Sequence, residues 1–98
     1  MPRDYFVYIL ANKTHSVLYT GVTNNIYQRI AQHKAQSKKS FTQRYKVTKL
    51  VYYEHTNDVG AAIMREKQIK SGSRQKKIDL IKSLNPEWRD LASDFYDP

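Results

Sequence analysis

A glutamate in the second half of this 98-residue chain stands where helical spacing predicts an apolar residue. Residues 59–70 are expected to form a helix with Val59, Ala62 and Ile63 as its buried stripe. Successive helical residues rotate by about 100°, so Glu66 falls within that stripe. A carboxylate there needs a cation, a metal ion or several donors as its partner, although an internal ion pair with a lysine or arginine would satisfy it as well.

An arginine and a histidine occupy one face of an earlier expected helix, residues 26–35. Arg29 and His33 are four residues apart, and His33 falls beside Ile26 and Ile30, so the shared face borders the core. The planar guanidinium of arginine matches phosphate oxygens, and an imidazole can accept, donate or relay a proton near neutral pH. The pair suggests phosphate chemistry, while an ordinary amphipathic boundary is the alternative explanation.

Two tyrosines lie on expected strands with their side chains on corresponding faces. Strand alternation places Tyr8 on the same side as Phe6 and Leu10, and Tyr19 on the same side as Gly21. The glycine leaves room above the sheet for a ligand or for another backbone. The alternative is that both tyrosines are core aromatics whose hydroxyls find local partners, because the chain contains 8 tyrosines.

The segments that would position these residues follow from the hydrophobic patterns and from the turn residues between them. The strands are expected at residues 5–10, 17–22 and 50–54. The helices are expected at residues 26–35, 59–70 and 73–84, with a further helical turn starting at Asn85 and Pro86. The first two strands form a hairpin and are apolar on both faces, so we expect them inside the sheet and covered on both sides.

This order of elements predicts an α/β fold of the α+β kind, in which a small three-stranded antiparallel sheet is flanked by helices. The length suits a single domain spanning residues 1–98, with a core of about residues 5–84 and a C-terminal extension at residues 85–98. Within this extension, Trp88 and Leu91 are expected to hold the chain against the core.

The charge of the chain is basic and unevenly distributed. Lys and Arg number 17 against 9 Asp and Glu, a formal net charge of +8, and the last 13 residues hold one basic and four acidic residues. A basic body with an acidic end predicts nucleic acid as the partner, while a solvated basic surface without a partner is the alternative. The residues expected to contact phosphates are Lys38, Lys39, Arg44, Lys46, Arg65, Lys67, Lys70 and Arg74.

The sequence lacks the residues that several classes of protein function require. Without cysteine the chain has no disulfide, no thiolate nucleophile and no Cys-ligated zinc. The three histidines are scattered, and 3 glycines provide no phosphate-binding glycine loop. No apolar run reaches the roughly 20 residues of a membrane span, and no signal peptide is recognisable. We therefore expect a cytoplasmic protein with no membrane partner, and the sequence leaves its oligomeric state open.

Taken in order, the residues that could do chemistry resemble the GIY-YIG nuclease family. Residues 7–9 and 19–21 occupy the places of its two name-giving triplets. Arg29, His33 and Glu66 follow in the order and with the spacing of that family. The likeness extends over nearly the whole chain, and the ordered set is more specific than either triplet alone.

The resemblance implies a metal-dependent endonuclease that hydrolyses phosphodiester bonds, of DNA rather than RNA, by nicking or by recognising branched or damaged structures, as in DNA repair. Glu66 would hold a single divalent cation, Mg²⁺ or Mn²⁺, and Arg29 would bind the scissile phosphate. Tyr8, Tyr19 and His33 would surround the attacking water and orient or deprotonate it. A tyrosine needs nearby positive charge to act as a base and a histidine does not, so both stay candidates for that role.

The chain also departs from the family pattern. Val7 replaces the glycine of the first triplet, and Thr20 replaces the isoleucine of the second. The asparagine that assists the site in well-studied members has no match, since Asn85 lies too far beyond Glu66. The tail at residues 85–91 resembles that of the short stand-alone bacterial (YhbQ-like) members. Whether the chain is an enzyme stays open, and the alternative is a non-catalytic nucleic-acid-binding or interaction module on the same fold.

Overall fold

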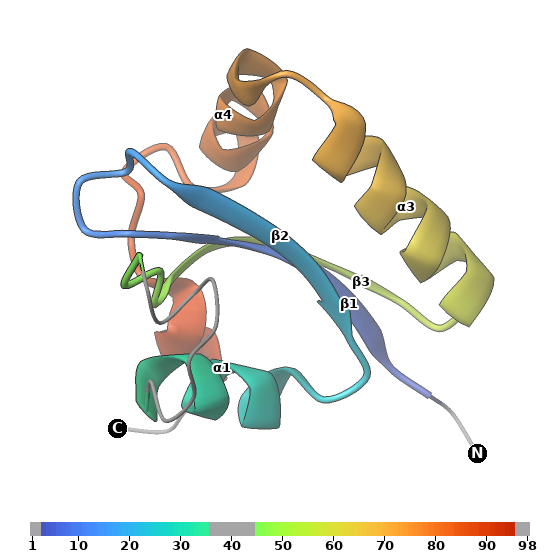
Figure 1. Cartoon of the computed structure of the whole chain (residues 1–98). Helices are drawn as coiled ribbons and strands as arrows, with labels where there is room; N and C mark the ends of the chain where they lie inside the picture. The colour runs from blue at the N-terminus through green and yellow to red at the C-terminus, as the bar shows by residue number, and fades with distance from the viewer. Residues whose placement is uncertain (1–2, 36–44, 96–98) are drawn as a thin grey trace.

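The three strands pair in an order that places the first strand in the middle of the sheet. The computed structural model describes residues 3–35 and 45–95. β1 (Tyr5–Ala11) pairs with β2 (Leu18–Thr23) on one side and with β3 (Lys49–Thr56) on the other, antiparallel in both cases (Figure 1). The predicted three-stranded antiparallel sheet is confirmed. The expected interior position is wrong for β2, which is an edge strand because no other described strand pairs with it.

Helices cover both faces of this sheet (Figure 1). α1 (Ile26–Ala35) and the 3-10 helix η1 (Leu91–Asp94) lie on one face, whereas α3 (Val59–Ser71) and α4 (Arg74–Leu84) lie on the other. The core is therefore double, with one apolar cluster on each face of β1, and this explains the continuous apolar sequence of that strand from Val7 onward. None of the helices in the described ranges is long and apolar enough to cross a membrane.

Helix α3 faces the sheet with a different line of residues from the predicted one. Val59 and Ile63 were expected to be buried but are 48% and 42% exposed, so the prediction is wrong for both. The buried residues are Ala62 and Ile69, and Glu66 lies between them, four residues after the first and three before the second. Residues with this spacing share one side of a helix, so Glu66 remains on the side that faces the sheet.

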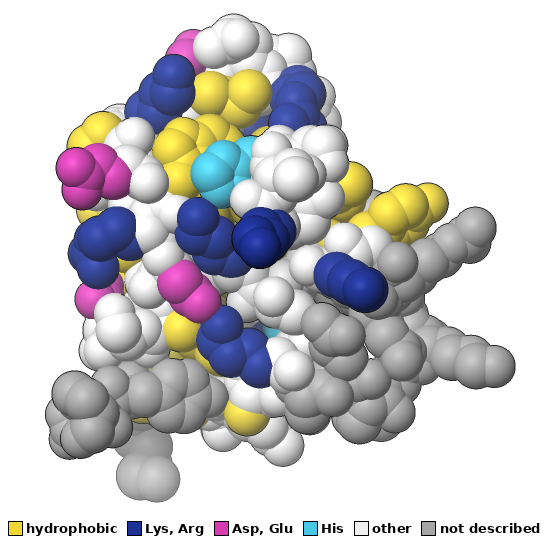
Figure 2. Space-filling view, turned by 90° about the vertical axis from the view of Figure 1, so that its left-hand side faces the viewer, with side chains coloured by type: hydrophobic (Ala, Val, Ile, Leu, Met, Phe, Trp, Pro, Cys, Tyr) yellow, Lys and Arg dark blue, Asp and Glu magenta, His cyan; other side chains and the backbone are white. Residues whose placement is uncertain are grey.

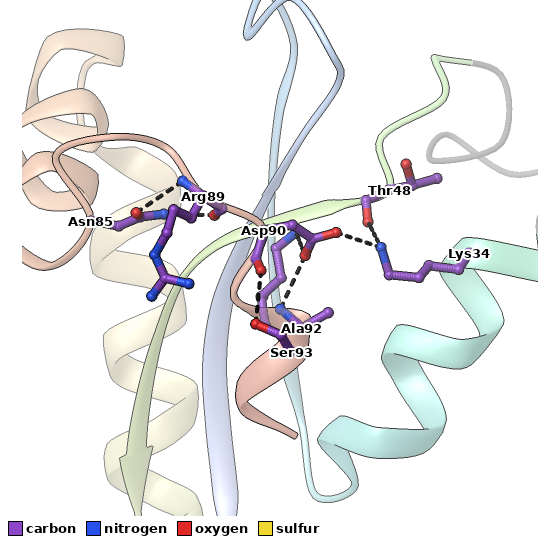
Figure 3. A network of polar contacts seen from close by, with 8 residues as sticks. Lys34, Thr48, Asn85, Arg89, Asp90, Ala92 and Ser93 are labelled. Carbon is purple, nitrogen blue, oxygen red and sulfur yellow. Dashed lines mark hydrogen bonds and ion pairs between the residues drawn. The ribbon is translucent and has the colours of Figure 1, made fainter. Parts of the chain in front are cut away.

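The chain after α4 forms a loop where a helical turn was expected. Residues 85–90 are not helical, and the helix begins later, at η1. The side-chain amide of Asn85 donates to the carbonyl oxygen of Arg89 at 2.8 Å, and its Oδ1 accepts from the Arg89 N–H at 2.9 Å (Figure 3). These side-chain bonds to the backbone favour the loop over a helix, and the predicted turn is wrong. Trp88 and Leu91 do pack against the two core clusters, as expected.

Asn85 also completes the hydrogen bonding of β3. The register of β1 and β3 shifts between Ile9 and Leu10, which makes Val51 the extra residue of a β-bulge. The amide of Asn85, which is 3% exposed, donates to the Val51 carbonyl oxygen at 3.1 Å. This buried asparagine therefore uses its polar atoms to hold the fold, away from the residues expected to do chemistry.

Asp90 ties the same loop to α1 and to the beginning of β3. Its carboxylate accepts from Lys34 Nζ at 2.6 Å and from the Leu50 N–H at 3.2 Å, and Lys34 also donates to the Thr48 carbonyl oxygen at 3.2 Å (Figure 3). Burial disfavours the charged form of Asp90, but the lysine and the backbone donors outweigh it and lower its pKa. The C-terminal segment is thus fixed on both faces of the sheet.

Candidate active site

The Tyr8 side chain crosses the neighbouring strand at Gly21. The two residues face each other in the register of β1 and β2. A Cβ atom on Gly21 would lie 2.5 Å from the Tyr8 hydroxyl oxygen and 2.6 Å from its ring carbon Cζ. The φ of Gly21 is outside the left-handed region, so space rather than backbone conformation requires a glycine here. The hydroxyl is thereby directed across β2, toward the edge of the sheet.

Three aromatic rings gather at this place. The ring centroids of Tyr8, Tyr19 and His33 are 5.8 to 6.4 Å apart. The Tyr8 hydroxyl lies 3.4 Å from His33 Nε2. Both tyrosines belong to the apolar cluster on the α1 face, so the expectation that they share a face is confirmed. The structure therefore brings together three of the five residues that the sequence singles out for catalysis.

A cation and a carboxylate both act on the Tyr8 hydroxyl. The pKa of Tyr8 is raised to about 12: burial is the largest cause, and the charges of Tyr19 and Glu66 add to it, whereas Arg29 opposes them through its charge and a hydrogen bond. Arg29 comes from α1, on the Tyr8 side of the sheet, but Glu66 comes from α3, on the other side. Because α3 packs against β2, the charge of Glu66 also acts on this hydroxyl, although its helix lies on the opposite face of the sheet from that of Arg29.

His33 is the half-buried base of this group. Burial lowers its pKa below the usual 6.5, and the positive charge of Arg29 lowers it further. The imidazole is therefore neutral at pH 7 and can accept a proton. Tyr8, by contrast, keeps its proton at that pH because its pKa is raised to about 12. The neighbouring groups thus differ in what they can do at neutral pH: His33 accepts a proton and Tyr8 donates one.

Glu66 has the environment of a carboxylate that can take a cation. Its side chain is 15% exposed, and its Oε2 accepts from Lys70 Nζ at 3.2 Å. Among the residues that the structure describes, none donates a hydrogen bond to the other carboxylate oxygen, and no group of three or more His, Asp and Glu side chains forms a metal cluster. A lone carboxylate fits a hard divalent ion that keeps water and phosphate oxygens as its other ligands.

Comparison with known proteins places this arrangement in a family. The profile described as the GIY-YIG catalytic domain matches residues 4–79. The chain belongs to the GIY-YIG family. The predicted resemblance is thereby confirmed, and with it a nuclease fold and a nucleic acid as the class of substrate that this family indicates.

Similar proteins support this GIY-YIG assignment along most of the chain. A UPF0213 protein of Natronomonas pharaonis is 38% identical over 81 residues, which cover 83% of this chain and 94% of that protein. A UPF0213 protein of Staphylococcus haemolyticus is 40% identical over 77 residues, covering 79% and 93%. The solution NMR structure of a UPF0213 protein from Bacillus halodurans has 27% identity and a TM-score of 0.58, covering 92% of this chain and 95% of that one. These likenesses identify the short stand-alone type of GIY-YIG domain.

The basic residues expected to contact phosphates have different surroundings in this GIY-YIG domain. Lys38, Lys39 and Arg44 lie outside the described residues, and Lys46 and Lys67 are exposed. Arg65 contacts Glu54 through Nε and Nη2 at 2.8 to 3.1 Å, and Lys70 contacts Glu66. Arg74 donates to the carbonyl oxygen of His15. The charges of Arg65 and Lys70 are therefore compensated by carboxylates.

A cavity on the α3 face of the sheet lies apart from the catalytic candidates. It has a volume of about 650 Å³ and lies between β3 and α3, where Glu54, Met64 and Arg65 are among its lining residues. None of the five expected catalytic residues lines it. We therefore locate the site from its chemical groups at the edge of β2 rather than from the size of a hollow.

One contact of the site was missed by sequence reasoning. Lys70 was expected to bind phosphate but is the ion-pair partner of Glu66. The four-residue spacing between the two on one helix predicts such a pair and would have revealed it. The alternative explanation of Glu66, an internal ion pair with a lysine, is therefore part of the structure.

Proposed function

We propose that this chain is a divalent-metal-dependent endonuclease that hydrolyses phosphodiester bonds, with DNA as its substrate, by nicking or structure-selective cutting. The observation that carries the proposal is the cluster of Tyr8, Tyr19 and His33, where the charges of Arg29 and Glu66, from helices on opposite faces of the sheet, both act on the Tyr8 hydroxyl. A phosphate placed there would meet a positive charge on one side and a carboxylate-held cation on the other. Such a pair stabilises the charge that develops during phosphoryl transfer.

Each side chain then has a role that follows from its chemistry. Arg29, for which no ion pair with another described residue is found, would hold phosphate oxygens through its planar guanidinium. Glu66 would hold the divalent cation, which when bound polarises the phosphate and lowers the pKa of coordinated water. Tyr8 and Tyr19 would orient the attacking water from the sheet side, next to His33.

We propose His33 as the group that takes the proton from the water. The water oxygen forms a bond to phosphorus, and its proton passes to the imidazole directly or through the Tyr8 hydroxyl. The bond from phosphorus to the sugar oxygen breaks, and that oxygen takes a proton from solvent and leaves as a hydroxyl. The 3.4 Å contact between Tyr8 and His33 Nε2 provides the path for such a relay. The raised pKa of Tyr8 and the neutral state of His33 at pH 7 both favour this assignment over a tyrosine base.

The ion pair between Lys70 and Glu66 favours a second candidate function. A lysine ammonium on the carboxylate competes with a metal ion, and a chain that kept this pair would bind nucleic acid without cutting it. This alternative predicts salt-sensitive binding that is indifferent to divalent cations and to substitution of Glu66.

Cleavage of supercoiled and branched DNA with Mg²⁺ or Mn²⁺ separates the two candidates. Glu66→Gln should abolish cutting while the domain stays folded. Glu54→Gln is the matched control, because Glu54 is also a half-buried, ion-paired glutamate but contacts Arg65 instead of the site. Equal residual cutting by the wild type and Glu66→Gln would show that the activity comes from a contaminant, and it would contradict the proposal. Metal-independent binding without cutting would support the second candidate.

A further inference from the structure

The basic side chains of this protein differ in whether a carboxylate compensates them. Lys34, Arg65 and Lys70 form ion pairs with acidic residues. Lys49 and Arg74, by contrast, contact neutral groups and form no ion pair with any other residue of the described ranges. Uncompensated positive charge is what an anionic ligand would meet first.

Lys49 and Arg74 share a further feature among the basic residues without an ion pair, because both are held at His15, in the connection between β1 and β2. The Lys49 ammonium lies 3.1 Å from His15 Nε2, and Arg74 Nη2 donates to the His15 carbonyl oxygen. Burial lowers the pKa of His15, and the Lys49 charge lowers it further. The imidazole is therefore neutral and accepts from the lysine. Three segments distant in the sequence thus place two cations around one ring.

The same ring stacks on the single tryptophan of the chain. The centroids of His15 and Trp88 are 4.3 Å apart, and their planes differ by 18°. Both residues have left-handed backbone conformations, with φ of 62° and 56°. Such values are uncommon for residues other than glycine, more so for tryptophan than for histidine, and they persist where surrounding contacts impose them. One side of Trp88 packs against the core, so the pair is built outward from the fold as a short aromatic column.

This column lies at the end of the sheet where the β1–β2 connection is found. Figure 2 looks onto that side and shows a histidine side chain at the surface with Lys and Arg side chains around it and a few acidic ones among them. The exposed Lys13 and Arg89 neighbour His15 and Trp88 in the chain. Flat aromatic surface next to uncompensated cations is the combination used to bind unpaired bases together with their phosphates.

We propose that His15 and Trp88, with Lys49 and Arg74, bind a single-stranded segment of the nucleic acid. A base would stack on the outer face of His15, and the phosphates beside it would contact the two cations. A duplex would not use the platform, because its bases already stack on one another. The proposal rests on the proposed function for its ligand class and deepens it by naming single-stranded or unpaired nucleic acid as the substrate.

The position of the platform suits one strand that also enters the active site. Lys49 pairs with Ala11 in the sheet, three residues along β1 from Tyr8. At roughly 3.3 Å per residue this is about 10 Å along the strand. Trp88 packs on the α3 face of the sheet and Tyr8 on the α1 face, so a strand leaving the candidate site would pass around the edge of the sheet to reach the platform within a few nucleotides.

Intrinsic fluorescence provides a direct test, because Trp88 is the single tryptophan. An oligothymidylate of about 12 nucleotides is titrated into the full chain in EDTA, beside a duplex of equal length. The oligothymidylate should quench Trp88 and bind more tightly than the duplex. Lys49→Gln should lower the slope of log affinity against log salt by about 0.7, the value of one phosphate contact on a single strand. Arg3→Gln is the charge-matched control at the opposite end of the sheet and should leave the slope unchanged.

A second variant tests the stacking itself. His15→Asn keeps a residue that tolerates the left-handed backbone but removes the ring, and it should weaken binding by about tenfold. Tighter binding of the duplex, no change in Trp88 fluorescence, or equal effects of Lys49→Gln and Arg3→Gln would each overturn the proposal. Equal competition by polyglutamate would also overturn it, in favour of an acidic protein partner. Because EDTA prevents cutting, this assay measures binding separately from cleavage. A chain that binds as expected in EDTA but does not cleave DNA when metal is present would contradict the proposed endonuclease and leave the single-strand site standing.

Discussion

Replacing Gly21 by alanine would place a methyl group where the Tyr8 hydroxyl now lies. The new Cβ would be 2.5 Å from that oxygen, 2.6 Å from Cζ and 3.1 Å from Cε2 of the ring. Ordinary contacts of this kind are about 3.5 Å, so the tyrosine or β2 must move by about 1 Å. Tyr8 is 1% exposed and belongs to a packed cluster, so it has little room to yield.

The expected cost follows from this displacement. Overpacking of a close-packed core costs about 1 to 3 kcal/mol of unfolding free energy. The hydroxyl would also leave its 3.4 Å contact with His33 Nε2. A misplacement of about 1 Å in a reacting group costs on the order of 100-fold in rate. We therefore expect Gly21→Ala to lose both stability and most of the cleavage rate.

Gly60→Ala is the matched control for the same chemical change. Its new Cβ would lie 3.4 Å from Asp58 Oδ1, an ordinary contact, in the first turn of α3. Replacing glycine by alanine within a helix raises the unfolding free energy by about 0.5 to 1 kcal/mol. Urea unfolding monitored by circular dichroism, together with single-turnover cleavage, measures both effects. If Gly21→Ala were as stable and as active as the wild type, the close approach of Tyr8 to β2 would be refuted.

Three further substitutions or conditions test other parts of the account. Asn85→Ala removes one buried hydrogen bond, to Val51, and two partly buried ones, to the backbone groups of Arg89, and should lower the unfolding free energy by about 3 kcal/mol in urea unfolding. A loss below about 1 kcal/mol would contradict the role of Asn85 in the bulge. With His33 as base, the cleavage rate should be level above pH 7 and fall tenfold per unit below the lowered pKa of His33, because protonation removes the acceptor. A rate that climbs steadily through pH 9 would indicate a tyrosine base instead. Lys70→Gln should tighten Mn²⁺ binding by up to about fivefold in calorimetry, since an exposed ion pair contributes up to about 1 kcal/mol, and weaker binding would show that the lysine does not compete for Glu66.

Local patterns in the sequence were sufficient to predict most of the fold. The apolar run of β1 predicts a strand buried on both faces, as the structure has it. The expected helix starts at residues 59 and 73 lie next to the observed caps, where Asp58 accepts from the Gly60 N–H at 2.9 Å and Ser73 from the Lys76 N–H at 3.1 Å. These features depend on a few neighbouring residues, so spacing alone reveals them.

The wrong predictions concern features that depend on distant contacts. An apolar sequence does not distinguish a central strand from an edge strand, so β2 was misplaced. The exposure of Val59 and Ile63 depends on where α3 crosses the sheet, which the helix itself does not encode. The loop at Asn85 depends on the hydrogen bond from its side chain to Val51, in a bulge 34 residues earlier in the chain. No local sequence pattern predicts that contact.

The candidate site was predictable as a set of residues but not as a geometry. Polar residues on core-facing positions pointed to Arg29, His33 and Glu66. The influence of Glu66 on the Tyr8 hydroxyl depends on the strand order and on the packing of α3 against β2, and the position of that hydroxyl depends on the space at Gly21. The stack of His15 on Trp88 joins positions 73 residues apart and involves unusual backbone angles at both, so no local pattern predicts it.

The central claim is that Glu66 places a divalent cation beside the Tyr8 hydroxyl. NMR spectra of the isotope-labelled chain, titrated with substoichiometric Mn²⁺, test it most directly, because the paramagnetic ion broadens signals only from nearby nuclei. The account predicts broadening at Glu66, Tyr8 and Arg29, which lie on different faces of the sheet, and its loss in Glu66→Gln. Broadening that persists in Glu66→Gln, or that centres on the acidic residues near Asp94, would contradict the account.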